Sequence, residues 1–319
     1  MLHHLSAARW MSLCSAVLLA ACGGSGGGAG APTGPAPSTT ISLSVPELAL
    51  AVSGKARIVT VTNTGSAPAL SVIYSLTPAT PVAVNTVSSC STLAPGASCQ
   101  ITITPGASAT AAPGITNPTP ITMNVGGVNT NLSTTALHVL DYGSVFQNGY
   151  VFALDDTTSN ATSVGGKVAA LNDLASALPW STTSALINAA SLNDGMANTQ
   201  AIVTIYDALS VSRADYAAGA CTALPSNGQN PWYLPAICEM SSAAAGCTPG
   251  QPNMQTNLVD TNGTLTGPVT WHWSSTESLA QPVTQSIQHQ FATGGTSSQR
   301  SEPKGSSFSA RCVRVIKTL

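Results

Sequence analysis

The chain has 319 residues, of which only 7% are charged, and its formal net charge is −2. This balance gives no electrostatic basis for binding nucleic acid, which requires a strongly basic surface. Apolar residues make up 43% of the chain, enough for a core. The surface must therefore be rich in hydroxyl and amide groups rather than charges.

The first 22 residues have the features of a bacterial export signal. A weakly positive start precedes an apolar run from Met11 to Leu19 and a pair of small residues. The run is too short to span a bilayer, which takes roughly 20 apolar residues. Leu19-Ala20-Ala21-Cys22 resembles the bacterial lipobox, whose cysteine is lipidated before cleavage. We therefore expect residues 1–21 to be a lipoprotein signal peptide and Cys22 to carry the lipid. The alternative is an ordinary secretory signal with a chance cysteine.

The next segment, residues 22–40, is uncharged and rich in Gly, Ser, Ala and Pro, which is typical of a flexible tether. Several acyl chains on Cys22 would attach the protein durably to a membrane. Gly23 is not the aspartate that resembles an inner-membrane retention signal, so we expect the outer membrane. The anchored chain can then face the periplasm or the cell surface.

Residues 41–138 predict an all-β domain. Its only ionised side chains are Glu47, Lys55 and Arg57. Arg57 to Asn63 alternates apolar and polar residues with period two, as a half-buried strand does. Many short strands divided by Pro-Gly and Asn-Thr-Gly turns favour an antiparallel sandwich. The strands are expected at 41–45, 48–52, 57–63, 70–76, 82–87, 100–104, 121–125 and 129–136.

Two cysteines of this domain, Cys90 and Cys99, flank a Pro-Gly turn, which makes a short disulfide geometrically easy. The segments Thr60–Gly65 and Leu93–Pro105 resemble those of immunoglobulin-like modules in bacterial surface proteins. The resemblance implies a spacer role, while ligand or strand binding remains the alternative.

From residue 139 onward, charges, aromatics and helix-compatible segments appear. Strands are expected at 149–155, 165–171 and 309–316, a helix at 197–209, and a second short helix after Pro235. Strands at both ends with helices between them favour an α+β fold. Six cysteines remain after Cys14 and Cys22, an even number that indicates three disulfides in an exported chain.

Five motifs occur in order in this second domain, residues 139–319. Together they resemble the C-terminal domain of the Legionella collagen-like adhesin, a C-type-lectin-like family. The motifs are Gly149-Tyr-Val-Phe, Asp194-Gly-Met-Ala-Asn-Thr199, Trp232-Tyr-Leu-Pro-Ala-Ile-Cys-Glu239, Trp273-Ser-Ser-Thr-Glu277 and Arg311-Cys-Val-Arg314. The resemblance implies a compact, sometimes trimeric domain on exported proteins, linked in the named member to glycosaminoglycan binding. It also implies a disulfide between Cys221 and Cys312, which leaves Cys238 with Cys247.

The same segment offers little for catalysis or metal binding. Gln251-Pro-Asn253 is similar to a calcium-lectin loop, but Ser274 and Ser275 follow Trp273 where that pattern needs Asn and Asp, so we expect no metal and no cofactor. Trp232, Leu234, Trp271 and Trp273 are expected in the core and framework. His272 is expected at the surface, and Asp155, Asp156 and Asp173 in loops. Because no hydrolase elbow is present and the cysteines have disulfide partners, we expect no enzyme.

Two functions remain open for this envelope lipoprotein. The first is adhesion or glycan binding by the lectin-like domain. From residue 139 the chain has seven Lys and Arg against eleven Asp and Glu, so a neutral glycan stacking on Tyr or Trp fits better than a polyanion. The alternative is a non-enzymatic structural or assembly lipoprotein that binds another envelope protein or self-associates.

Overall fold

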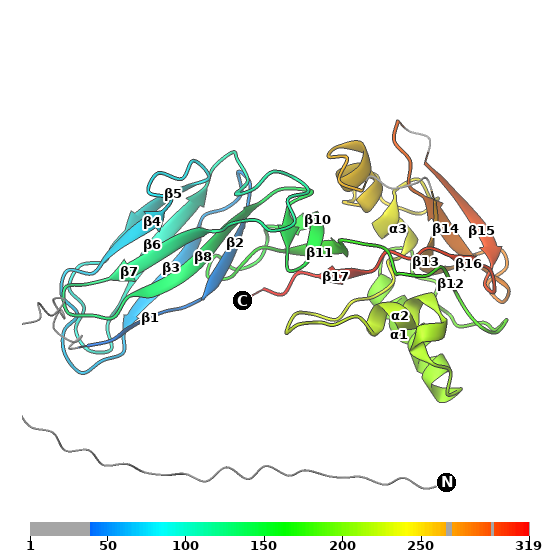
Figure 1. Cartoon of the computed structure of the whole chain (residues 1–319), viewed down its shortest axis with the longest axis horizontal. Coiled ribbons are helices and arrows are strands. Elements are labelled where there is room, and N and C mark those ends of the chain that lie inside the picture. The colour runs from blue at the N-terminus through cyan, green and yellow to red at the C-terminus, as the bar shows by residue number, and fades with distance from the viewer. Residues whose placement is uncertain (1–38, 266–269, 295–296, 319) are drawn as a thin grey trace, which may run out of the picture. The chain divides into compact units, whose positions relative to one another are not determined.

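The computed structural model describes residues 39–265, 270–294 and 297–318, within a compact unit that spans residues 37–319. The predicted signal peptide, most of the tether and the expected lipidation site Cys22 lie outside the described residues. We describe a first part, residues 39–140, and a second part, residues 141–318 (Figure 1). No helix in these described ranges is long and apolar enough to cross a membrane.

The first part consists of two four-stranded sheets whose apolar faces enclose one core. One sheet has the order β1-β3-β6-β5 and the other β2-β8-β7-β4 (Figure 1). The strands are β1 (Ile41–Leu43), β2 (Glu47–Ala51), β3 (Arg57–Asn63), β4 (Ile73–Thr77), β5 (Val84–Ser88), β6 (Ser98–Pro105), β7 (Ile121–Gly126) and β8 (Ser133–Leu140). All eight predicted strands are present, with ends that differ by up to four residues.

The pairing differs from the prediction at one place. The sheets are antiparallel except for β2, which pairs in parallel with β8. The period-two pattern of β3 appears as alternating burial, with Val59 and Val61 fully buried. Because the turn after β2 delivers β3 into the opposite sheet, β2 and β8 do not form a hairpin and can run in the same direction.

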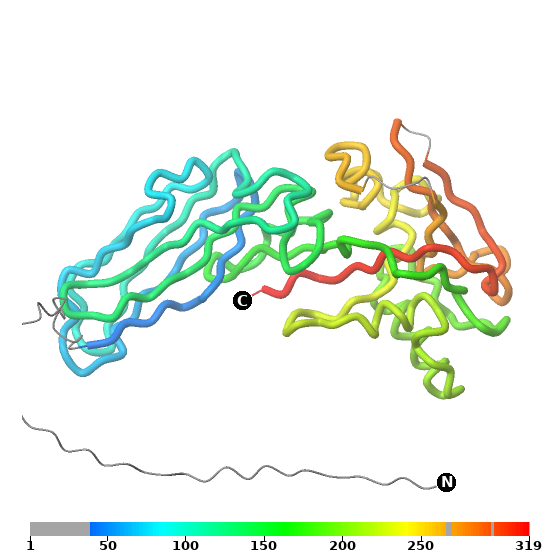
Figure 2. The backbone as a smooth tube through the Cα atoms, in the orientation of Figure 1, coloured from blue at the N-terminus to red at the C-terminus, as the bar shows by residue number. Residues whose placement is uncertain are grey.

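The second part is α+β. One sheet has the order β17-β11-β10-β9, a second β13-β14-β15, and β12 pairs with β16. Figure 2 shows the C-terminal segment (red) running back across this part, which places β17 beside β11. The strands are β9 (Val145–Phe146), β10 (Gly149–Asp155), β11 (Gly165–Ala170), β12 (Leu178–Pro179), β13 (Trp271–Glu277), β14 (Gln285–Gln290), β15 (Ser298–Pro303), β16 (Ser307–Phe308) and β17 (Val313–Val315); the helices are α1 (Gly195–Ala208), η1 (Arg213–Asp215), α2 (Ala217–Thr222), α3 (Ile237–Met240) and the π-helix η2 (Gln255–Asp260).

Helix α1 begins where its sequence supplies a cap and a glycine. The Asp194 side chain accepts a hydrogen bond from the Ala197 amide, which satisfies one of the free donors at the helix start. Gly195 is required because a Cβ there would lie 2.4 Å from a carboxylate oxygen of Glu239. The first turn of α1 is therefore fitted against a buried acid on α3.

The motif segments contact one another. The Leu234 amide donates to the Thr199 hydroxyl at 3.0 Å, and the Ile237 amide donates to the Thr276 hydroxyl at 3.1 Å. The Ser275 amide donates to the Pro235 carbonyl at 2.7 Å. The segments thus form one framework that joins α1, α3 and β13.

The buried side chain of Arg57 connects the first part with the loop between β10 and β11. It pairs with Asp156 and donates to the carbonyl oxygens of Thr158 and Ser159. The Ile58 amide donates to the Asn160 carbonyl at 2.8 Å. A specific partner therefore explains this charged side chain in an almost uncharged segment. A buried guanidinium is tolerated when most of its donors are satisfied, and of the Arg57 nitrogens Nε has no hydrogen-bond partner within the described residues.

Three disulfides are present in the structure: Cys90–Cys99, Cys221–Cys312 and Cys238–Cys247. They are the pairs that the sequence led us to expect. Cys221–Cys312 joins α2 to the segment before β17 across a separation of 91 residues, whereas the other two close separations of nine. The long bridge therefore restricts the unfolded chain most.

We predict that the three disulfides contribute unequally to stability. Replacing Cys221 and Cys312 together by alanine should lower the free energy of unfolding by about 2 kcal/mol more than replacing Cys238 and Cys247, because loop-closure entropy grows with loop length. Urea unfolding of the oxidised proteins measures both losses. Equal losses, or a larger loss for the short bridge, would contradict this account.

Candidate functional site

A hollow of about 320 Å³ in the second part, lined by both apolar and polar residues, is the candidate site. Its lining includes Asn148 from the turn between β9 and β10, Asn172 and Asp173 from the loop after β11, Asn227 from the loop before the Trp232 motif, and Trp232 itself. We call it the asparagine hollow.

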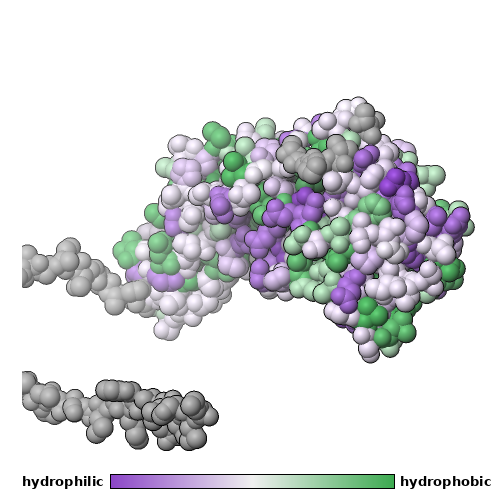
Figure 3. Space-filling model, turned by 45° about the vertical axis from the view of Figure 1, so that its right-hand side comes forward, coloured by the Kyte–Doolittle hydropathy of each residue, from purple (hydrophilic) through white to green (hydrophobic). Residues whose placement is uncertain are grey.

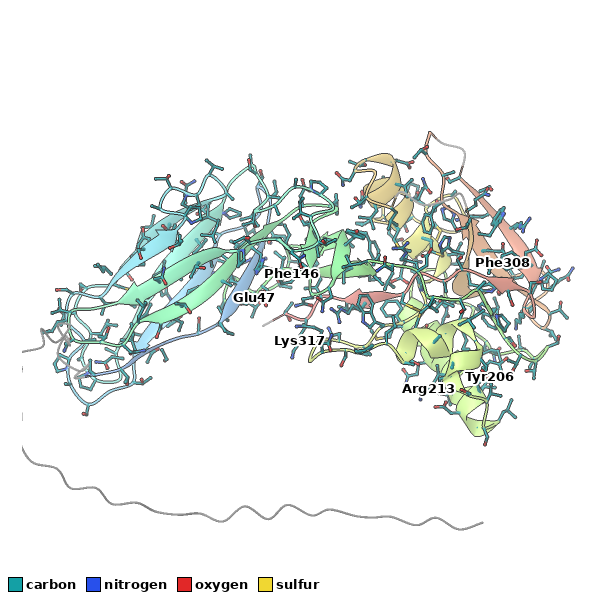
Figure 4. The ribbon with its side chains drawn as sticks, in the orientation of Figure 1. Glu47, Phe146, Tyr206, Arg213, Phe308 and Lys317 are labelled. Carbon is teal, nitrogen blue, oxygen red and sulfur yellow. A yellow bond between two sulfur atoms is a disulfide. The ribbon has the colours of Figure 1, made fainter. Side chains whose placement is uncertain are left out.

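The three asparagines are exposed, and their side-chain amides have no hydrogen-bond partner within the described residues. Asn148 and Asn227 have φ angles of 61° and 51°, a region that asparagine tolerates better than most residues. The β9–β10 turn is held by Gln147, whose side chain exchanges two 2.9 Å hydrogen bonds with the backbone of Lys317. Figure 4 labels Lys317 and also Phe146, which precedes Gln147 in the chain. The backbone thus determines the positions of these side-chain amides, while their donors and acceptors remain available to bind a ligand.

Asp173 is the only ionised side chain in this lining. Arg311 Nε donates to its Oδ1 at 2.6 Å, and His272 Nε2 lies 3.1 Å from its Oδ2. Burial would raise the pKa of this carboxyl, but the His272 ring and the Arg311 guanidinium outweigh burial and hold the pKa below its usual value. A carboxylate that stays ionised is a hydrogen-bond acceptor rather than a general acid.

His272 is not at the surface, so that expectation was wrong. Its ring is buried, pairs with Asp173 through Nε2, and lies 3.1 Å from the Thr270 carbonyl through Nδ1. The residue faces away from the indoles of Trp271 and Trp273, as strand alternation requires. The loop after β11, which carries Asp173, covers the face of β13 to which His272 belongs, and nothing in the sequence indicated this contact. Asp173 likewise lies in a loop as expected, but in a network of charges.

The expected framework residues Trp232, Leu234 and Trp273 are buried, and Trp271 is partly buried. A cation covers one face of three tryptophan rings. Lys304 lies 4.6 Å from the Trp180 ring centroid, Arg314 lies 4.2 Å from that of Trp232, and Arg300 lies 4.0 Å from that of Trp271. Trp273 meets Phe308 edge to face. Stacking of a sugar on the covered face of one of these rings would have to displace its cation.

Arg314 itself is fully buried beside Trp232. Its Nη1 donates to the Ser226 carbonyl at 3.1 Å, and Nε and Nη2 have no hydrogen-bond partner. Burial lowers the pKa of Arg314 to about 10. The cation is thus supported mainly by the face of the indole, an interaction that strengthens when water is excluded. Replacing Trp232 would remove this support together with part of the lining of the hollow.

Glu239 is a buried carboxylate with a structural role. Its oxygens accept four hydrogen bonds, from Lys167 Nζ at 2.5 Å, the Tyr233 hydroxyl at 2.8 Å, and the amides of Ala236 at 2.7 Å and Gly195 at 3.2 Å. Burial and the neighbouring carboxylate raise the pKa of Tyr233 well above its usual value, so the phenol stays a donor. All the acceptor capacity of this acid is used in joining α1, α3 and β11.

Glu277 is buried in the same manner. It accepts from the amides of Ile187 at 2.9 Å and Ala189 at 3.1 Å, and from Lys304 Nζ at 2.5 Å. Lys304 and Glu277 are each 1% exposed, and Lys304 also donates to the Ala185 carbonyl. Burial lowers the pKa of Lys304, and Glu277 partly offsets that effect. The pair fixes the irregular segment before α1 and does not face the asparagine hollow.

Metal binding finds no support in the part of the chain that the structure describes, where no group of three His, Cys, Asp or Glu could hold an ion. In the Gln251-Pro-Asn253 segment, Asn253 is buried, and its side-chain oxygen accepts from the Thr256 amide at the start of η2. Of the other aspartates expected in loops, Asp155 ends β10 and binds Thr157, and Asp156 pairs with Arg57.

Comparisons with known proteins give little. No family model and no curated protein matches the chain. Two solved structures are weakly similar. The chaperone DraB of E. coli has a TM-score of 0.26 and 13% identity, over 40% of this chain and 67% of that one. The secreted serine protease VesC of Vibrio cholerae has a TM-score of 0.23 and 11% identity, over 85% of this chain and 45% of that one. The chain thus spans less than half the length of VesC.

We predict that His289 makes the second part sensitive to acid. Its ring is buried on β14, with Nε2 3.1 Å from the Gln255 side-chain oxygen, and burial together with nearby His272 lowers its pKa to about 3. Below pH 6.5 the His289 ring becomes protonated in the unfolded state but stays neutral in the folded state until the pH approaches 3. Stability should therefore fall by about 2–3 kcal/mol between pH 7 and pH 4.5.

The measurement is urea unfolding across this pH range for the natural protein and for His289→Gln, which retains a donor toward Gln255. The variant should lose most of the fall in stability that His289 causes. The same pH slope in both proteins would show that His289 is not the group responsible.

Proposed function

We propose that this protein is a lipid-anchored envelope protein of the outer membrane whose second part binds a neutral glycan at the asparagine hollow. In this proposal the first part is an immunoglobulin-like spacer, and the second part is a C-type-lectin-like binding domain without enzymatic activity. The single observation that carries the proposal is the set of three exposed carboxamides with unused donors and acceptors around one hollow.

The chemistry of the hollow suits sugar hydroxyls. Each carboxamide of Asn148, Asn172 and Asn227 can donate and accept at once, as a hydroxyl does. The Asp173 oxygens already accept from Arg311 and His272, but each retains a lone pair for a hydroxyl proton. A hollow of about 320 Å³ is large enough for one or two sugar rings.

Charge argues against an anionic ligand. The one ionised group in the lining is the carboxylate of Asp173, and the chain from residue 139 has eleven acids against seven bases. A sulfated polysaccharide would meet net repulsion there. The face of the molecule in Figure 3 is mostly of intermediate hydropathy, with hydrophilic and hydrophobic residues in small groups, which fits a surface rich in serine and threonine hydroxyls.

The test is an array of neutral and acidic glycans probed with the full chain in detergent. We expect binding to uncharged glycans. Removing one amide by Asn172→Ala, or by Asn227→Gly, which suits the left-handed backbone, should weaken the affinity by severalfold to about tenfold, the value of one or two hydrogen bonds.

Asn193→Ala is the matched control, because Asn193 is also exposed but lies outside the hollow. The affinity of this variant for the glycan should be unchanged. Binding that survives both hollow variants would place the site elsewhere. No binding to any glycan, combined with cross-linking to one defined envelope protein in intact cells, would favour the assembly function instead.

A further inference from the structure

An apolar patch occupies the outer face of the first part beside the edge strand β4. Four large side chains form it, with exposed fractions of 44% for Leu70, 69% for Ile73, 79% for Val128 and 68% for Leu132. Three of them, Ile73, Val128 and Leu132, line a hollow of about 440 Å³ whose lining also includes Gly126 and Gly127. We call these residues the β4 patch.

The glycines create the hollow. Gly126 is paired with Ile73 across β4 and β7, and a Cβ on Gly126 would contact the Leu132 side chain at 3.4 Å. Gly127 packs so closely on the Leu70 carbonyl that a Cβ would lie 2.4 Å from its oxygen. The backbone therefore forms a floor without side chains, and Ile73, Val128 and Leu132 project around it.

This arrangement places projecting side chains and a cavity on the same small surface. A two-fold interface brings the same patch of both copies together, so a patch that carries both projecting side chains and a hollow can be complementary to itself. β4 has β7 as its one strand neighbour in the described sheet, so its outer backbone edge is also open. Strand edges in soluble proteins are usually protected by charges, prolines or bulges.

No charge protects this edge. Between Arg57 and His138 the chain contains no Asp, Glu, Lys, Arg or His. Two copies that meet through this face therefore bring no like charges together. A protein partner with a charged surface would find no counter-charge here, which favours a second copy of the chain over such a partner.

We infer that the β4 patch is a self-association surface through which two copies of the chain form a two-fold dimer. Stable interfaces bury about 1,200 Å² or more in total, so the open faces of β4 and β7 must contribute along with the four side chains. We accordingly expect a dissociation constant in about the micromolar range. The inference does not depend on the proposed glycan binding.

The experiment is sedimentation equilibrium of the full chain in a density-matched detergent, which excludes the detergent from the measured mass. Val128→Lys introduces two charges into the dimer interface and should raise the dissociation constant at least about tenfold. Val87→Lys is the matched control, since Val87 is 72% exposed on β5 of the other sheet and should change the constant by less than about twofold.

A natural protein that stays monomeric at the highest concentration tested would overturn the inference, as would a trimer. An equal effect of Val128→Lys and Val87→Lys would also overturn it, because association would then be unspecific. The thermal unfolding midpoints of both variants must match that of the natural protein. If Val128→Lys fails this check, Leu132→Lys takes its place with the same expected result.

Discussion

The second part depends on two buried carboxylates, Glu239 and Glu277. They accept hydrogen bonds from backbone amides that have no partner in a helix or strand. Each also pairs with a lysine, and each is 1% exposed. Moving a carboxylate out of water costs several kcal/mol, so such an acid persists only when hydrogen bonds offset that cost. Removing one partner of a buried pair typically costs about 3–5 kcal/mol. These acids therefore select one arrangement of loops around the framework.

The functional consequence is a separation between framework and binding surface. The acids, lysines and tryptophans that would attract attention in a search for catalysis are engaged with one another, as in the set of Glu277, Lys304 and Trp180. The groups that remain available in the asparagine hollow are exposed amides on loops. Loops on a rigid framework are the usual place for recognition. A charge-poor protein thus retains a specific surface through hydrogen-bonding capacity.

Much of the fold could be predicted from the sequence, because local patterns determine it. The alternation in residues 57–63 and the cap at Asp194 act through neighbours in sequence, and β3 and α1 are found where they were expected. The parallel pairing of β2 with β8 and the burial of His272 could not be predicted, since both arise from segments far apart in the chain.

The candidate site was harder to find by sequence. Asn148, Asn172 and Asn227 each look like an ordinary turn residue, and only the folded chain brings them to one hollow. The ends of two motifs, Glu239 and Glu277, were visible in sequence, but their role as acceptors for distant amides was not. Three-dimensional proximity, rather than residue type, defines both the framework and the site.

Native-state hydrogen exchange tests the framework claim most directly. The amides of Ile187, Ala189, Gly195 and Ala236 lie in irregular segments or at helix starts, where exchange is usually fast. If the carboxylates hold them, all four should exchange only with free energies close to that of global unfolding. In Glu277→Gln the exchange free energies of Ile187 and Ala189 should fall below that of global unfolding, while those of Gly195 and Ala236 should stay close to it. Exchange at the rate of exposed loop amides in the natural protein would contradict the account.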